Sequence, residues 1–304
     1  MQNLPDFLVV GPPKTASTSL HYYLSQHPEV FMSPKKETRF FDVHYEKGLD
    51  YYSEFFKDRK NQKMTGEASP TYAFLPFVAG RIKNNLPDAK IIFCFRDPVE
   101  RAFSGWLMRG SKGNETLSFR QALEKNLEQR EHINFNDEEG ARIWLDDQQT
   151  LYKKNKLTIR TYIEGSMYAE QLKSYRKYFA DEKIKVLLLD DLKNDFRGAL
   201  LSIFEFLNVD STVTAGIRNE TKNQHNKNML KPLFNLVGKE VVFKAGKIIP
   251  KGMRNKLFEF AVKGKQEKPK INEADRSFAY NIFRNDVEEL EKLLAKDLSA
   301  WKNF

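Results

Sequence analysis

A loop near the N-terminus carries the side chains best suited to bind an anion. The run Gly11-Pro12-Pro13-Lys14-Thr15-Ala16-Ser17-Thr18-Ser19 joins an apolar stretch to a helical pattern. The first backbone N–H groups of a helix lack an intrahelical partner, and the helix dipole favours negative charge there. The hydroxyls of Ser17, Thr18 and Ser19 add donors, and Lys14 adds a positive charge. These residues predict a phosphate-binding loop, although a capped helix with a surface lysine would give the same pattern.

The order of residues in this loop differs from that of a Walker A loop. The Walker A motif ends in Gly-Lys-Ser/Thr, with the hydroxyl on magnesium. Here Lys14 comes early, and no glycine follows it within the loop. A kinase that uses magnesium and ATP therefore remains only an alternative, against which the loop argues.

A second candidate anion site follows the apolar run Lys90–Phe95. Arg96 directly follows that run, Pro98 predicts the start of a helix, and Ser104 comes eight residues after the arginine. Arginine offers a planar fork of donors to a phosphate, and serine offers a hydroxyl. The alternative is that Arg96 pairs with an acid and Ser104 packs. Two such sites, each after its own strand, favour a ligand with two separate phosphates.

Strand and helix patterns alternate along the chain. Apolar runs at Phe7–Val10, Lys90–Phe95 and Lys185–Leu189 each lead through a loop into a helical pattern. This alternation predicts an α/β fold, in which helices flank a parallel β-sheet. Ligands of such sheets bind at the carboxyl ends of the strands. Residues 111–163 predict a charged helical insertion, and residues 272 to about 301 predict a closing helix.

The loop from Lys14 to Leu20 resembles the 5′-phosphosulfate loop of the sulfotransferases that use 3′-phosphoadenosine 5′-phosphosulfate (PAPS). The run Arg96 to Ser104 resembles the 3′-phosphate site of the same family. The resemblance implies one sulfotransferase domain over residues 1–304, with a P-loop-like fold, that moves a sulfonate group from PAPS to an acceptor hydroxyl. It implies that Lys14 stabilises the leaving oxygen, that the residues after it hold the 5′-phosphate, and that Arg96 and Ser104 hold the 3′-phosphate.

Two residues of the first loop depart mildly from the family pattern. Many members carry glycine where Ala16 stands and threonine where Ser17 stands.

The run from Ser33 to Asp42 resembles the segment that carries the catalytic base in the glycosaminoglycan and bacterial branches of this family. There a glutamate precedes a Phe-Phe pair, and Glu37 is the match. A carboxylate within reach of an alcohol can take its proton as sulfur is attacked. The resemblance implies in-line transfer without a covalent enzyme intermediate or an obligatory metal. The alternative is that Glu37 is one charge in a solvated Lys-Lys-Glu run.

Arg39 stands where some relatives have a histidine, so it could bind an anionic acceptor or orient Glu37. The run from Gly66 to Tyr72 resembles the next family block, and we expect Ser69 and Tyr72 to line the cleft. Relatives that act on heparan chains often have a lysine where Ala68 stands, which weakens a glycosaminoglycan assignment. We expect a carbohydrate or glycoconjugate acceptor, although a lipid-linked glycan or a small molecule also fits.

The net charge of +9 is concentrated in one segment. Residues 222–270 hold 13 Lys and Arg against 3 Glu and so account for the whole excess. This segment could be a lid over the nucleotide, a contact with an anionic membrane, a site for an acidic polysaccharide, or a solvated surface. A non-enzymatic protein that binds anionic lipid or glycan is therefore a further alternative. We expect no nucleic-acid binding, because no known binding module is present.

Three features bear on the compartment. No apolar stretch is long enough to cross a bilayer, and the N-terminus lacks the basic region of a signal peptide. The single cysteine, Cys94, excludes an internal disulfide and fits a reducing environment. We expect a cytoplasmic protein, with peripheral membrane contact through residues 222–270 as an option.

Overall fold

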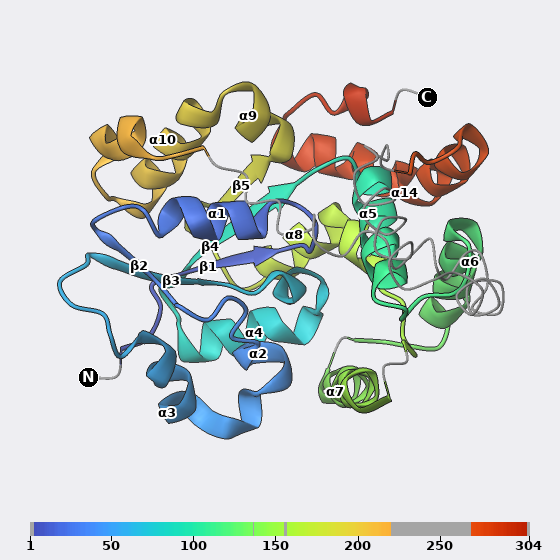
Figure 1. Cartoon of the computed structure of the whole chain (residues 1–304), viewed down its shortest axis with the longest axis horizontal. Helices are drawn as coiled ribbons and strands as arrows, with labels where there is room; N and C mark the ends of the chain where they lie inside the picture. Colours follow the sequence, from blue (N-terminus) through green and yellow to red (C-terminus); the bar gives the residue numbers. More distant parts are fainter. Residues whose placement is uncertain (1–2, 136, 155–156, 220–268, 303–304) are drawn as a thin grey trace, which may run out of the picture.

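The computed structural model describes residues 3–135, 137–154, 157–219 and 269–302. A five-stranded sheet runs through it, in the order β2-β3-β1-β4-β5 (Figure 1). The strands are β1 (Phe7–Gly11), β2 (Val30–Met32), β3 (Met64–Ala68), β4 (Lys90–Phe95) and β5 (Ile184–Leu188). Every neighbouring pair is parallel. The predicted α/β fold with a parallel sheet is therefore confirmed.

Helices cover both faces of this sheet (Figure 1). The described α-helices are α1 (Ser17–Leu24), α2 (Phe40–Val43), α3 (Gly48–Ser53), α4 (Pro76–Asn85), α5 (Pro98–Ser111), α6 (Phe119–Arg130), α7 (Glu138–Lys154), α8 (Tyr168–Arg176), α9 (Leu189–Asn194), α10 (Phe196–Leu207) and α14 (Glu273–Leu294). The described 3-10 helices are η1 (Tyr45–Lys47), η2 (Glu54–Phe56), η3 (Pro70–Phe74), η4 (Glu164–Ser166), η5 (Asp181–Lys183), η6 (Ser211–Gly216) and η8 (Ser299–Trp301).

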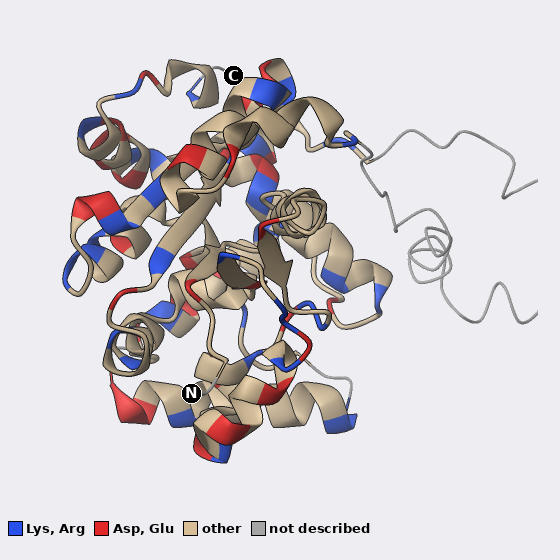
Figure 2. Cartoon of the chain, turned by 90° about the vertical axis from the view of Figure 1, so that its left-hand side faces the viewer, with Lys and Arg blue, Asp and Glu red and all other residues tan. Residues whose placement is uncertain are grey.

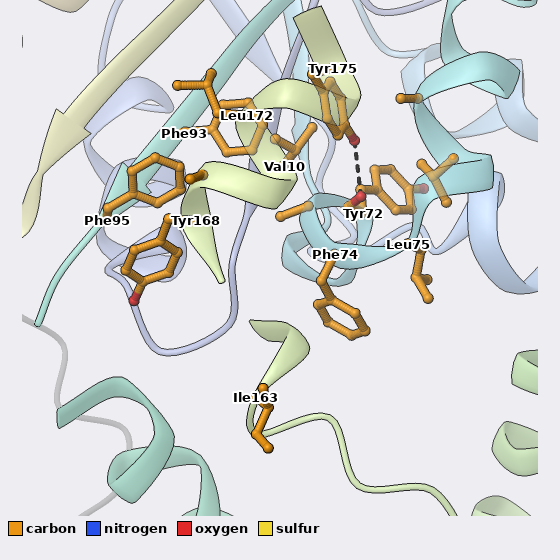
Figure 3. Packing of buried hydrophobic residues seen from close by; sticks show 14 of the residues in the cluster. Val10, Tyr72, Phe74, Leu75, Phe93, Phe95, Ile163, Tyr168, Leu172 and Tyr175 are labelled. Carbon is orange, nitrogen blue, oxygen red and sulfur yellow. Dashed lines mark hydrogen bonds between the residues drawn. The ribbon is translucent and has the colours of Figure 1, made fainter. Parts of the chain in front are cut away.

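The apolar runs of β1 and β4 supply both hydrophobic cores. Side chains alternate across a strand, so Phe7 and Val9 pack with α1 and α10, whereas Leu8 and Val10 face the opposite cluster. On that second face, aromatic rings of β4 meet rings of α8, as Figure 3 shows. The ring centroids of Phe95 and Tyr168 lie 4.4 Å apart, in a stacked arrangement. Because both faces are covered, these strands are apolar except for Lys90 at the start of β4, which explains why the sequence reveals them.

β2 and β3 carry no strand signal that is visible in the sequence. β2 has only three residues, and β3 contains Gly66 and Glu67. A Cβ atom at Gly66 would lie 2.2 Å from the ring of Phe7 on the neighbouring strand, so only glycine fits there. Packing between strands, rather than local propensity, explains this residue.

The closing α-helix, α14, ends earlier than predicted. The expected helix to about residue 301 stops at Leu294, because Ala295 takes a left-handed conformation with φ 49°. A separate turn, η8, then brings Trp301 into the core. The third strand likewise lies one residue earlier than expected, at Ile184–Leu188. The predicted insertion forms α6 and α7.

Charges of both signs are interspersed over the described helices (Figure 2). The basic segment 222–270 lies outside the described residues except for its last two positions. None of the helices in the described ranges combines the length and the apolar character that a bilayer span requires.

Candidate active site

The loop between β1 and α1 passes close to the chain that follows β3. Gly11 has a φ of +115°, and a Cβ atom there would lie 2.3 Å from the carbonyl oxygen of Pro70. Glycine therefore serves this position for two reasons, its free φ and its missing side chain. The loop lies at the carboxyl end of β1, where open parallel sheets bind their ligands.

The backbone of this loop is left-handed at two non-glycine residues. Lys14 has a φ of 76° and Ala16 a φ of 72°. Glycine adopts this conformation freely, so the glycine common in the family and the Ala16 of this chain serve the same backbone shape. Thr15 is buried, and its hydroxyl donates to the carbonyl of Pro12 at 2.6 Å. The side chain of Thr15 therefore stabilises the loop from within.

The first turn of α1 has the properties of an anion site. Ala16 occupies the N-cap position and has no side-chain oxygen to cap the turn, as the predicted anion site requires. Ser17 is buried, Ser19 is half-buried and Thr18 is exposed. The predicted 5′-phosphate residues thus lie together at the N-terminus of one helix.

Arg96 at the end of β4 touches the first loop. Its Nη1 donates to the carbonyl oxygen of Lys14 at 3.4 Å, and its side chain is only 22% exposed. Since β1 and β4 are neighbours in the sheet, the two predicted phosphate loops come together at one edge. Ser104 lies farther along α5 and is half-buried.

Arg101, in the first turn of α5, is engaged within the protein. It is 3% exposed and donates to the hydroxyl of Ser166 at 2.7 Å and to the carbonyl of Tyr162. Burial lowers the pKa of its guanidinium to about 10, and the nearby charge of Arg96 acts in the same direction. Arg101 therefore adds positive charge beneath the site and fastens α5 to η4.

Glu37, the predicted base, lies at the surface beside a lysine. Its side chain is 37% exposed, and Lys36 donates to its carboxylate at 3.2 Å. The neighbouring Thr38 is fully buried and donates to Glu67 at 2.5 Å. An accessible carboxylate is thus attached to a firmly held backbone, an arrangement suited to a positioned general base.

The buried carboxylate of Glu67 organises the segment beneath Glu37. It also accepts hydrogen bonds from Tyr52 at 2.7 Å and Ser69 at 2.8 Å. Burial raises the pKa of Glu67, and these hydrogen bonds oppose the rise. Sequence reasoning did not single out this residue, because β3 has no strand signal in the sequence that would mark Glu67 as buried.

Ser69 and Tyr72, predicted to line the acceptor cleft, are both fully buried. The hydroxyl of Tyr72 accepts from the N–H of Phe41 at 3.1 Å and lies 3.3 Å from the hydroxyl of Thr38. Both residues therefore support the Glu37 segment from the inside, and direct contact with an acceptor stays a prediction.

Arg39 joins the Glu37 segment to α7. Its Nε donates to Asp42 at 2.6 Å, and its Nη2 donates to Gln148 at 3.4 Å. The side chain of Asp42 is fully buried and also accepts from Thr71 at 2.7 Å. The guanidinium lies 6.0 Å from the ring of Trp144. Arg39 is thus engaged within the protein, and Asp42 is a partner that sequence reasoning did not assign.

Comparison with known proteins identifies the family. The family model described as "Sulfotransferase domain" matches residues 4–284. The chain is 36% identical over 134 residues to the membrane-associated sulfotransferase kil1 of Dictyostelium discoideum, a match that covers 41% of this chain and 28% of that protein. It is 40% identical over 119 residues to the human bifunctional heparan sulfate N-deacetylase/N-sulfotransferase 2, which covers 36% of this chain and 14% of that protein. The chain thus matches less than a third of the length of either relative.

A solved structure matches over the full length. The crystal structure of a sulfotransferase from Alicyclobacillus acidocaldarius aligns with a TM-score of 0.66 and 26% identity, covering 98% of this chain and 99% of that one. The sequence resemblance and the predicted sulfotransferase fold are therefore confirmed. The two loops predicted to bind anions meet at one edge of a parallel sheet of this fold, and this chain belongs to the sulfotransferase domain family.

Proposed function

We propose that this chain is a PAPS-dependent O-sulfotransferase that transfers a sulfonate group to a hydroxyl of a carbohydrate or glycoconjugate. The observation that carries this proposal is the contact between Arg96 and the carbonyl of Lys14. It brings the loops after β1 and β4 to one edge of the sheet. A donor with phosphates on both its 5′ and 3′ positions matches such a pair of loops, whereas ATP uses only one of them.

The residues proposed to bind PAPS form two groups, one for each phosphate. The first turn of α1, with Thr15 to Ser19, would hold the 5′-phosphate, and Arg96 with Ser104 would hold the 3′-phosphate. PAPS supplies the activated sulfonate group. Lys14 stabilises negative charge on the oxygen that leaves with the nucleotide. The buried cation of Arg101 strengthens the positive potential at the same edge.

Glu37 acts as the general base on the acceptor side. Its exposed carboxylate removes the proton of the acceptor hydroxyl, while Thr38 and Glu67 fix the backbone behind it. The ion pair between Arg39 and Asp42 favours an orienting role for Arg39 over direct binding of an anionic acceptor. Ser69 and Tyr72 contribute by supporting this segment.

A carbohydrate acceptor is supported by the name of the human relative, which includes heparan sulfate. Ala68 departs from the lysine often found in relatives that act on heparan chains, so a different glycan is proposed. We also propose a cytoplasmic location with an option of peripheral membrane contact, which the name of the Dictyostelium relative supports.

Calorimetric titration tests the donor assignment. We expect wild type to bind 3′-phosphoadenosine 5′-phosphate (PAP), the product of PAPS, in preference to ATP with magnesium. Arg96→Ala is expected to lose that preference. Binding of ATP alone would favour a kinase, and binding of neither nucleotide would favour a protein that binds anionic lipid or glycan.

Glu37→Gln tests the base. With PAPS and a panel of oligosaccharides, amines and small alcohols, we expect PAP release to fall by about 10²–10⁴-fold, as general-base loss predicts, while PAP affinity is retained. The control is Glu46→Gln, which removes an exposed carboxylate in η1. Unaltered turnover in Glu37→Gln would exclude Glu37 as the base. Preference for amine acceptors would replace O-transfer by N-transfer.

A further inference from the structure

The last described helix reaches the two acids that flank Arg96. α14 packs against α5 (Figure 1). Its residue Arg276 donates to both Asp97 and Glu100. The distances are 2.6 Å from Nη2 to Asp97 and 3.1 Å from Nη1 to Glu100. Arg276 is separated from these acids by well over half of the sequence, so no local pattern reveals the contact.

Each carboxylate uses its two oxygens for different partners. Oδ1 of Asp97 accepts from the N–H groups of Val99 and Glu100 and so caps α5, while Oδ2 faces Arg276. Oε1 of Glu100 faces Arg276, and Oε2 lies 3.4 Å from Arg96. Glu100 therefore stands between two arginines, and its contact with Arg276 is the shorter one.

This arrangement matters because a phosphate and Glu100 compete for the same guanidinium. Without Arg276, Glu100 would pair with Arg96 alone and Asp97 would lack its cationic partner, so the negative charge of these two carboxylates would repel a dianionic phosphate. Arg276 neutralises one of these charges and draws Glu100 toward α14. The fork of Arg96 is then available to a ligand.

We propose that Arg276 is a positioning residue for the 3′-phosphate of the donor, acting through Glu100 rather than by contact with the phosphate. This inference rests on the proposed function, since it assumes that Arg96 binds that phosphate. It makes α14 part of the donor site and explains how the chain recognises a 3′-phosphate although two acids adjoin Arg96.

The test compares PAP with adenosine 5′-monophosphate (AMP), which lacks the 3′-phosphate, by calorimetric titration. In Arg276→Ala we expect PAP to bind about tenfold more weakly, because Glu100 then competes with the 3′-phosphate for one charge-assisted contact of Arg96. AMP should bind as in wild type. In Arg276→Ala with Glu100→Gln, PAP affinity should return to within about threefold of wild type. Arg284→Ala, on the exposed side of the same helix, is the matched control and should change neither affinity.

Glu100→Gln alone provides a test that does not depend on the folding of Arg276→Ala. It should increase the preference for PAP over AMP, because Arg96 loses its competing carboxylate. Thermal denaturation of every variant establishes that it is folded at the temperature of titration.

Three outcomes would overturn the inference. Arg276→Ala could keep the full preference for PAP, the double variant could remain as weak as Arg276→Ala, or Glu100→Gln could weaken PAP binding. The second result would assign Arg276 to direct phosphate contact. If wild type itself does not prefer PAP over AMP, the proposed function fails first, which is a different result.

Discussion

Ala16, in the proposed phosphate loop, has a backbone conformation that costs stability. Its left-handed conformation costs an L-residue roughly 1–2 kcal/mol, a cost that glycine avoids at the expense of a more flexible unfolded chain. We expect Ala16→Gly to raise the free energy of unfolding by about 0.5–1 kcal/mol, measured by urea denaturation.

Ala122 inside α6 is the matched control for this change, because its backbone is helical. There the same substitution should lower the free energy of unfolding by about 1–2 kcal/mol, because glycine disfavours the helix and Ala122 also loses a buried methyl group. Equal losses at both positions would show that the backbone at Ala16 is not strained.

Glu67 is a buried carboxylate that accepts hydrogen bonds from three neighbouring hydroxyls. A glutamine at this position cannot accept from Thr38, Tyr52 and Ser69 together in the same way, since one of its oxygens becomes a donor group. We expect Glu67→Gln to lower the free energy of unfolding by about 1–3 kcal/mol. It should also reduce turnover of PAPS while leaving PAP affinity intact.

Denaturation, turnover and titration of the same preparation check this prediction, with Glu46→Gln as the control. Loss of PAP affinity in parallel with turnover would instead indicate general damage to the fold. Unchanged turnover would mean that Glu67 supports the core but not the base.

The roles of such residues set the limit of sequence reasoning. Lys14, Arg96 and Glu37 are visible in short motifs, because their function depends on neighbours in the chain. The burial of Tyr72 and Arg101 depends on partners that lie far away in the sequence, such as Ser166. No local pattern indicates that these polar side chains support the site from within.

At the scale of elements, α14 is joined to α8 by a buried carboxylate. Asp286 accepts from the N–H groups of Ala169 and Glu170, at 3.0 and 3.1 Å, in the first turn of α8. Burial raises the pKa of Asp286 to about 6, and these hydrogen bonds oppose the rise. The ionised form is therefore less favourable in the folded protein than in the unfolded chain.

This raised pKa predicts a pH effect on stability. Between about pH 4 and pH 6 the folded protein holds more protons at Asp286 than the unfolded chain, so the contribution of this group to stability falls as pH rises. Relative to Asp286→Asn, wild type should lose roughly 1–3 kcal/mol of unfolding free energy across this window. Denaturation curves at several pH values measure the difference, and a difference that is constant with pH would contradict it.

The strands also fall into two groups, those that the sequence reveals and those that depend on distant partners. β1, β4 and β5 are apolar runs that the sequence reveals, whereas β2 and β3 are short or interrupted by Gly66 and Glu67. β3 pairs in parallel with β1, and β2 pairs in turn with β3, so these two strands are defined by pairing within the sheet rather than by local sequence. The position of the Glu37 segment, which lies between them in the chain, could therefore not be derived without the sheet.

At the scale of the whole molecule, the strand order explains how the proposed donor loops and the proposed base belong to one sheet. The chain leaves β1 toward β2 and β3 on one side, and it later adds β4 and β5 on the other. The proposed donor loops follow β1 and β4, while the proposed base lies between β2 and β3. The reversal at β1 is the kind of switch point at which open α/β sheets bind ligands. Sulfonate transfer would take place beside the central strand.

The central place of β1 also has a consequence during synthesis. β1 precedes both of its partners, β3 and β4, so the ribosome produces the innermost strand before either neighbour exists. Until then its two edges carry unpaired backbone groups on an entirely apolar strand, which other chains can join. During that interval the run Phe7–Gly11 is the expected site of pairing between nascent chains.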